Sequence, residues 1–151
     1  MASETKKGAK HLTVEAYLDL PDDELDALSD DEFLQAQRAA LEAERATYSE
    51  QALALKAEAD SIARDSEPGD TQFDEESGEG ATATIDRERD LALAASARAA
   101  VEEIDGAFRK MDHGVYGQCE NCHQLIPRAR LRALPYARLC VTCKEGGLSR
   151  R

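Results

Sequence analysis

The sequence predicts a mainly α-helical protein, built as an antiparallel α-helical coiled-coil hairpin with a small four-cysteine module at its C-terminal end. Two long segments carry apolar residues at helical spacing, and a segment rich in glycine, proline and acids separates them. Two CxxC pairs follow near the end of the chain. Because the 151 residues include no Trp, three Phe and four Tyr, a large globular core is not expected.

The first 28 residues precede the periodic segments, and we expect them to form a flexible acidic N-terminal arm with a short helix around the sequence PDDELDAL, residues 21–28. The arm lacks the apolar stretch of a signal peptide. The sequence also has no 18-residue apolar run that would suggest a membrane span. We therefore expect a cytoplasmic protein with no membrane partner.

Residues 29–112 are predicted to form the coiled-coil hairpin. Ser29 and Glu32 have the spacing of a capping box, so the first helix should begin near Asp30. One seam position of a coiled coil recurs every seven residues, at Leu34, Leu41, Tyr48, Leu55 and Ile62. The companion position is weaker, because it holds Arg38, Arg45, Ala52 and Ala59. Small residues in the seam favour a closely packed pair of helices.

A tip loop is expected over residues 64–84, where Pro68 and three glycines interrupt the pattern and acids dominate. Helical spacing returns from about Ile85, through Ala97, Val101, Ile104, Phe108 and Met111, and His113-Gly114 should end that helix. An antiparallel hairpin is the simplest arrangement, because each helix has one apolar stripe and the other helix is the nearest surface to cover it.

The charge is divided between the two parts of the chain. Residues 1–111 hold 12 Lys/Arg against 28 Asp/Glu, whereas residues 112–151 hold seven against three. An acidic body repels phosphates, so free nucleic acid is a poor candidate partner for the whole chain. The sequence contains no arrangement of nucleophile, base and acid that would indicate catalysis, so we do not expect an enzyme.

Residues 113–151 are predicted to form a four-cysteine zinc finger with a basic tail. The two CxxC pairs have the spacing of a structural Zn²⁺ site in which protein thiolates fill all four positions, namely Cys119, Cys122, Cys140 and Cys143. A segment of about 30 residues buries too little surface to fold alone, so one structural Zn²⁺ should decide its folding. Pro127 should open a short helix between the pairs.

Other interpretations of these cysteines stay open. Cys119 to His123 matches the C-x-x-C-H pattern of haem attachment, but the second CxxC would then be unexplained. A thioredoxin-like dithiol would require a βαβ context, which is missing. A redox-sensing zinc site is a further possibility, since thiolates are oxidisable. The arginines between the pairs also leave open a zinc-dependent DNA-binding or adaptor protein that acts through its basic finger.

The segment GVYGQCENCHQLIPRARLRALPYARLCVTCK, preceded by DRERDLALAASARAAVEEIDGAF, resembles the DksA/TraR proteins with a C-terminal C4 zinc finger. The resemblance covers roughly residues 67–144. It implies a transcription regulator that binds RNA polymerase through its secondary channel, with the coiled-coil tip near the active centre and no sequence-specific DNA binding.

The resemblance also implies roles for particular residues. Family members of this kind carry two tip aspartates in an Asp-x-x-Asp-x-Ala pattern, and Glu67 and Asp70 stand at the matching positions, with Gln72 in place of the alanine. Arg87 and Arg89 keep basic positions that would contact the polymerase. Some members respond to guanosine tetraphosphate through basic residues, but Ala94 and Leu134 replace two of these and only Lys144 matches. We therefore do not expect alarmone dependence.

Overall fold

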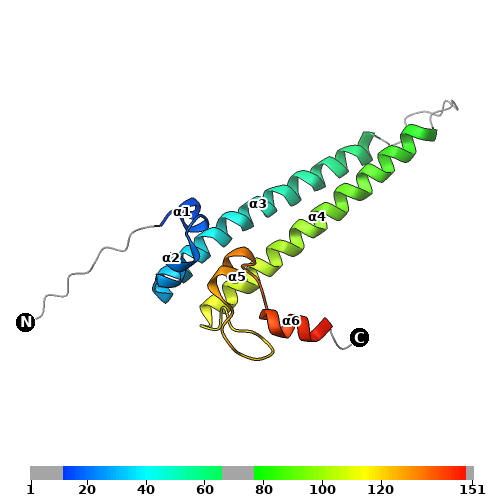
Figure 1. The fold of residues 1–151 in the computed structure, drawn as a ribbon. Helices are drawn as coiled ribbons and strands as arrows, with labels where there is room; N and C mark the ends of the chain where they lie inside the picture. Colours follow the sequence, from blue (N-terminus) through cyan, green and yellow to red (C-terminus); the bar gives the residue numbers. More distant parts are fainter. Residues whose placement is uncertain (1–11, 66–76, 149–151) are drawn as a thin grey trace, which may run out of the picture. The chain divides into compact units, whose positions relative to one another are not determined.

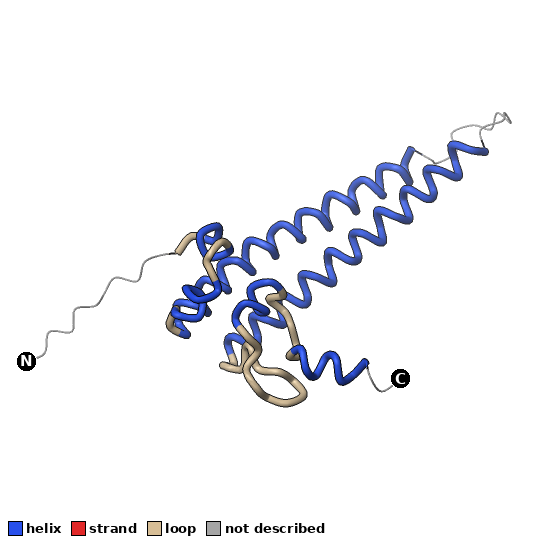
Figure 2. The backbone as a smooth tube through the Cα atoms, in the orientation of Figure 1, coloured by secondary structure: helices blue, strands red, loops and turns tan. Residues whose placement is uncertain are grey.

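The computed structural model describes residues 12–65 and 77–148, and the regular elements in these parts of the chain are helices (Figures 1 and 2). An isolated antiparallel bridge between Gln118 and Leu125 is the β-type pairing in the same parts. The helices, in chain order, are α1 (Val14–Leu18), α2 (Asp22–Ala27), α3 (Asp30–Asp65), α4 (Ser77–Asp112), α5 (Arg128–Ala133) and α6 (Val141–Leu148).

The start of α3 is fixed by the predicted capping box. The backbone N–H of Ser29 donates to the Glu32 carboxylate at 2.9 Å, and the N–H of Glu32 donates to the Ser29 hydroxyl at 3.2 Å. These bonds satisfy two amide groups that have no partner inside the helix. The helix therefore begins at Asp30, as the sequence predicts.

The helices α3 and α4 run antiparallel and side by side, which confirms the predicted hairpin (Figure 1). The order of their ion pairs establishes the direction. Arg38 pairs with Asp112 at 2.5 Å and Arg45 pairs with Asp105 at 2.7 Å, so the partner on α4 moves backward as the position on α3 moves forward.

The chain divides into two compact units, and α3 and α4 contribute to both. Residues 43–105 form the coil unit, whose buried positions are mostly alanines: Ala52, Ala59, Ala94 and Ala97, together with Ile104 and Asp90. The companion seam position, weak in the sequence, is thus the more buried one here, because Tyr48 and Leu55 stay partly exposed. Alanine lets two helix backbones approach closely, in agreement with the predicted tight pair.

The expected loop over residues 64–84 is wrong at both edges. The first helix of the hairpin continues to Asp65, and the second begins at Ser77, about eight residues before the predicted start near Ile85. Gly78 and Gly80 therefore lie inside α4. Each glycine costs a helix roughly 1 kcal/mol relative to alanine, a cost that a helix of 36 residues tolerates.

The second unit, here called the finger unit, contains residues 1–42 and 106–151. Its core brings together side chains that are distant in the sequence: Tyr17, Leu25, Phe33, Ala36, Cys119, Ile126 and Leu131. Tyr17 and Leu25 are fully buried. The N-terminal segment is therefore not a flexible arm from Leu12 onward, although α2 confirms the short helix predicted around residues 21–28.

None of the helices in the described ranges, 12–65 and 77–148, is long and apolar enough to cross a membrane.

Candidate metal centre

Four cysteine side chains converge in the finger unit. Cys119 and Cys122 come from the turn after α4, whereas Cys140 and Cys143 lie at and within the start of α6. Their sulfur atoms all lie within 4.8 Å of one another, and the Sγ atoms of Cys122 and Cys140 are 3.8 Å apart. The predicted ligand set is thus brought together in one place.

This geometry fits one tetrahedral Zn²⁺. Four Zn–S bonds of about 2.3 Å place the sulfurs of a tetrahedral site about 3.8 Å apart, which is the separation of Cys122 and Cys140. The donor set consists of four thiols with no position left for water or a substrate. The four cysteines therefore fit one structural zinc ion, which they would hold with all four thiolates.

The first CxxC turn is shaped by its backbone. The N–H of Cys119 donates to the carbonyl of Gln124 at 2.8 Å, and the N–H of His123 donates to the carbonyl of Cys119 at 2.9 Å. Gly117 has φ of 81°, a left-handed conformation that favours glycine, and a Cβ atom there would lie 3.0 Å from Leu131. His123 is exposed and its side chain is outside the ligand set.

The environment favours a thiolate at Cys119. The backbone N–H groups of Cys122 and Cys140 point at its sulfur and lower its pKa to about 6, with the Cys140 N–H at 3.4 Å. For Cys143 the amide of Asn121 lowers the pKa, but the neighbouring sulfurs and burial outweigh it and raise the pKa to about 12. Four thiolates this close repel one another, so a divalent cation among them supplies the missing charge balance.

Charged side chains beside the centre are paired within the unit. Glu120 accepts from Lys110 at 2.7 Å and from Arg138 at 3.0 Å. These hydrogen bonds, first from Arg138 and then from Lys110, lower the pKa of Glu120 to about 2. Glu120 therefore joins the end of α4 to the segment before Cys140.

Two further arginines attach the N-terminal helices to the finger. Arg128 donates to the carbonyls of Leu25 at 3.0 Å and Leu28 at 2.7 Å, and to the Asp30 carboxylate at 2.7 Å. Its guanidinium also lies 4.8 Å from the centre of the Phe33 ring, within cation–π distance.

Arg132 acts in the same way, donating to the carbonyl of Leu20 and to Asp22 at 2.7 Å. The carbonyls at the end of α2 have no basic side chain of their own helix to pair with, so Arg128 takes that role. These contacts hold the side chains of Arg128 and Arg132 against the protein, and each side chain is less than one-fifth exposed.

A buried polar network crosses the finger unit. The amide oxygen of Gln37 accepts from the Tyr17 hydroxyl, while its nitrogen donates to the Tyr116 hydroxyl at 2.8 Å and to the carbonyl of Leu131 at 2.7 Å. Tyr116 in turn donates to the carbonyl of Pro135 at 2.6 Å. Gln37 is 1% exposed, so its amide fixes how α1, α3 and the finger meet.

A family model for the prokaryotic DksA/TraR C4-type zinc finger matches residues 114–146, the segment that contains all four ligands. Residues 114–146 therefore match a DksA/TraR zinc finger. General stress protein 16O of Bacillus subtilis is 43% identical over 60 residues, which cover 40% of this chain and 37% of that protein. The RNA polymerase-binding transcription factor DksA of Caulobacter vibrioides is 35% identical over 65 residues, 43% of this chain and 46% of that one.

A likeness in fold to one solved structure covers more of the chain than the zinc finger. The structure of transcription factor DksA2 from Pseudomonas aeruginosa matches with a TM-score of 0.71 and 22% sequence identity. The match covers 85% of this chain and 96% of DksA2. The sequence relatives, in contrast, are matched over less than half of their own length.

The remaining predicted site residues have different outcomes. Arg87 and Arg89 are exposed on α4, where Arg89 lies 3.8 Å from Asp86 and 3.6 Å from Asp90. Glu67 and Asp70 fall outside the described residues. The sequence did not identify Gln37, Arg128 and Arg132 as structural residues. Each binds a group about 100 residues away in the chain, and no local pattern predicts which polar groups they will bind.

Proposed function

We propose that the protein is a non-enzymatic transcription regulator that binds RNA polymerase through the secondary channel. The observation that carries the proposal is the combination of an antiparallel hairpin with a DksA/TraR zinc finger, in a fold that covers 96% of DksA2. The name of the Caulobacter relative supports it, since that protein is described as RNA polymerase-binding. Cytoplasmic location follows from a partner of this kind.

In this proposal the tip of the hairpin acts electrostatically near the polymerase active centre. Glu67 and Asp70 are the proposed tip carboxylates, at the segment that joins α3 to α4. Arg87 and Arg89, exposed on α4, are proposed to contact acidic polymerase surface. A Glu at the first position and Gln72 at the third alter the reach and fit of the tip relative to the family pattern.

The finger is proposed to support the regulator without reading DNA sequence. Arg128 and Arg132 donate to carbonyls and carboxylates of the N-terminal helices, and Arg138 pairs with Glu120. Arginines engaged in this way have few donors left for phosphates or base edges. These contacts weigh against the alternative of a zinc-dependent DNA-binding protein.

Alarmone independence is part of the same proposal. Ala94 is fully buried in the coil unit, so no basic side chain is presented at that position. Leu134 is partly exposed where a second basic residue would stand, and Lys144 alone keeps its charge. We expect the effect on transcription to be the same with and without guanosine tetraphosphate.

The test is polymerase pull-down together with transcription in vitro, using purified zinc-loaded protein. The double variant Glu67→Ala/Asp70→Ala should bind polymerase and lose the effect on transcription, whereas Glu102→Ala/Glu103→Ala, two exposed acids of α4, should retain both. Cys119→Ser should lose binding because the finger fails to fold. Absence of polymerase binding by the zinc-loaded wild type, with salt-sensitive binding to bare duplex DNA, would overturn the proposal.

A further inference from the structure

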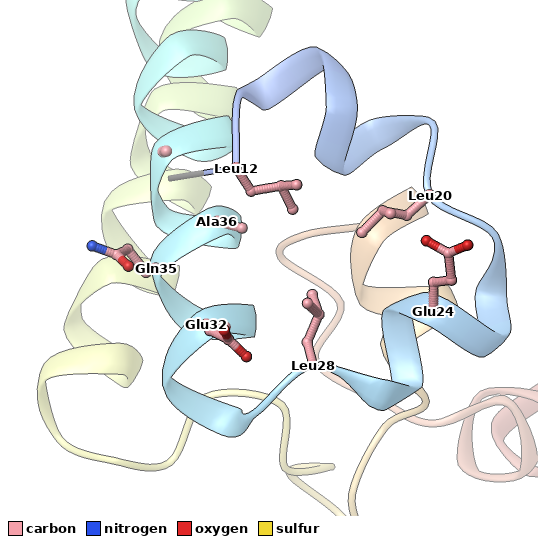
Figure 3. Close-up of a pocket in the computed structure, with 8 residues that line it drawn as sticks. Leu12, Leu20, Glu24, Leu28, Glu32, Gln35 and Ala36 are labelled. Carbon is pink, nitrogen blue, oxygen red and sulfur yellow. The ribbon is translucent and has the colours of Figure 1, made fainter. Parts of the chain in front are cut away.

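An apolar cavity lies between the N-terminal helices and the beginning of α3, within the finger unit (Figure 3). Its volume is about 330 Å³, and we call it the N-terminal groove. The groove is lined by Leu12, Leu20, Glu24, Leu28, Glu32, Gln35, Ala36 and Ala39. The four cysteines and the proposed tip are not among these residues.

The two walls of the groove differ in character. The wall from α3 is one helical face with i, i+3, i+4, i+7 spacing, and its two alanines leave space where larger side chains would fill it. Leu12, Leu20 and Leu28 line the other side, and Figure 3 shows these three side chains converging on the middle of the cavity. We call this apolar interior, formed by the three leucines and the two alanines, the floor of the groove.

The finger holds the leucine wall in place. Arg132 donates to the carbonyl of Leu20, and Arg128 donates to the carbonyl of Leu28. The backbones of two of the three leucines are therefore fixed by arginines of α5. Because the wall is tied to the finger, it is not free to move toward Ala36 and Ala39 and close the space.

The rim of the groove is acidic. Glu24 and Glu32 line it, and the segment from residue 12 to residue 42 contains ten acids and one base, Arg38. Hydrogen bonds from the Ser29 backbone N–H and then the Ser29 hydroxyl hold the pKa of Glu32 below its usual range, so this carboxylate is ionised at neutral pH. A ligand that covers the groove meets apolar surface in the middle and negative charge at the edge.

We propose that the N-terminal groove is a docking site for a cationic amphipathic helix of a partner protein, with leucine-like side chains in the cavity and Lys or Arg over Glu24 and Glu32. Helix-in-groove recognition of this kind uses apolar anchors at i, i+3 or i+4 spacing. A volume near the lower end of the ~300–1,000 Å³ range of ligand pockets admits only a few anchors, so the rim supplies the rest of the recognition. The site is independent of the proposed tip function.

Charge and apolar content together favour this occupant over the chain's own first residues. Residues 1–11 carry Lys6, Lys7 and Lys10, which complement the rim, but Met1 is their one large apolar side chain. A second copy of the chain would bring a body with a net charge of −12 to an acidic rim. A separate amphipathic basic helix offers apolar side chains to the floor of the groove and positive charges to its acidic rim.

The test is binding of a fluorescein-labelled model peptide made of Leu and Lys, with leucines at i, i+3, i+4 and i+7, to the full zinc-loaded chain. The matched control is a scrambled peptide of the same composition, which keeps the charge and loses the apolar face. Leucine methyl NMR spectra of the chain, recorded with and without peptide, report whether Leu12, Leu20 and Leu28 are the residues affected.

Protein variants separate the floor from the rim. Ala39→Phe fills the cavity and should weaken binding about tenfold, equivalent to ~1.4 kcal/mol, and Glu24→Lys should weaken it about fivefold. Glu42→Lys, an exposed acid of α3 that does not line the groove, should leave binding within twofold. Circular dichroism establishes whether each variant is folded. If Ala39→Phe does not fold, Glu24→Lys still tests the site.

Deletion of residues 1–11 should leave peptide binding unchanged or stronger. Equal binding of the scrambled peptide, or no difference between Glu24→Lys and Glu42→Lys, would overturn the proposal in favour of nonspecific charge attraction. Concentration-dependent dimerisation that Ala39→Phe abolishes, without peptide binding, would identify a second copy as the occupant and also overturn it. Binding of dodecylamine but not the peptide would assign the groove to small amphiphiles instead.

Discussion

The finger unit and the coil unit reach stability by different means. The finger unit combines large buried side chains, a polar network through Gln37, carbonyls held by Arg128 and Arg132, and the zinc ligands. The coil unit buries mainly alanines along two helices. The finger unit thus depends on a few specific contacts, whereas the coil unit depends on many small contacts that repeat along its helices.

Removal of zinc should give the largest loss of folded structure, and this loss should fall on the finger unit and spare most of the coil unit. Structural zinc contributes an apparent ~10–16 kcal/mol in small modules, so Cys119→Ser or a strong chelator should unfold the finger while much of the helical signal from α3 and α4 remains. Circular dichroism measures the helix, and Tyr fluorescence in a Tyr48→Phe background follows the finger unit, which then holds all the remaining tyrosines. Complete loss of helix at the same chelator concentration would mean that the units unfold together.

The next largest effect is expected from Gln37→Met. The change removes the acceptor for the Tyr17 hydroxyl and the donor to the Leu131 carbonyl, and buried polar groups without partners cost about 1–3 kcal/mol each. We expect the free energy of unfolding to fall by about 3 kcal/mol. Urea unfolding measures it, and Gln51→Met, at an exposed position of α3, is the control that should change little.

Ala59→Leu tests the tight alanine seam of the coil unit. Ala59 is fully buried, so the added atoms have no room and overpacking should cost about 2 kcal/mol. Ala57→Leu, two residues earlier and exposed, adds the same atoms to the solvent side. Thermal unfolding should give a lower melting temperature for Ala59→Leu than for Ala57→Leu. Equal melting temperatures would show that the seam has room for the larger side chain.

Alkaline pH should weaken the finger unit by the smallest amount. Burial raises the pKa of Tyr17 to about 12, although Arg132 and Arg128 lower it in part. Because the folded-state pKa lies above the ordinary value of about 10, this stabilisation is complete below pH 10 and is lost as the pH rises toward 12. We expect a loss of about 1 kcal/mol by pH 11, measured against Tyr17→Phe, whose stability should change less with pH.

The parts of the fold that depend on neighbouring residues were predictable. The Ser29–Glu32 capping box and the CxxC spacing each involve residues three apart, and both predictions are confirmed by the structure. The glycines at 78 and 80 misled the prediction of the second helix, because local propensity is a weak term in a long helix.

The N-terminal segment was mispredicted for the opposite reason. An acidic, short sequence gives no sign that Tyr17 will reach Gln37 or that Leu25 will be fully buried. Those outcomes depend on a finger that lies more than 90 residues later in the chain. The roles of Glu67 and Asp70 stay predictions, to be decided by the transcription assay.

The arginine contacts of α5 also set an order for folding. Arg132 binds the Leu20 carbonyl across 112 positions, and Arg128 binds the Leu25 carbonyl across 103. During synthesis α1 and α2 leave the ribosome before α5, which carries the arginines that bind their carbonyls. Contacts so distant in sequence form late, because the intervening chain must be ordered before they close. The N-terminal helices therefore complete these contacts only after the finger has been made, and we expect zinc supply to set the moment at which they fold onto it.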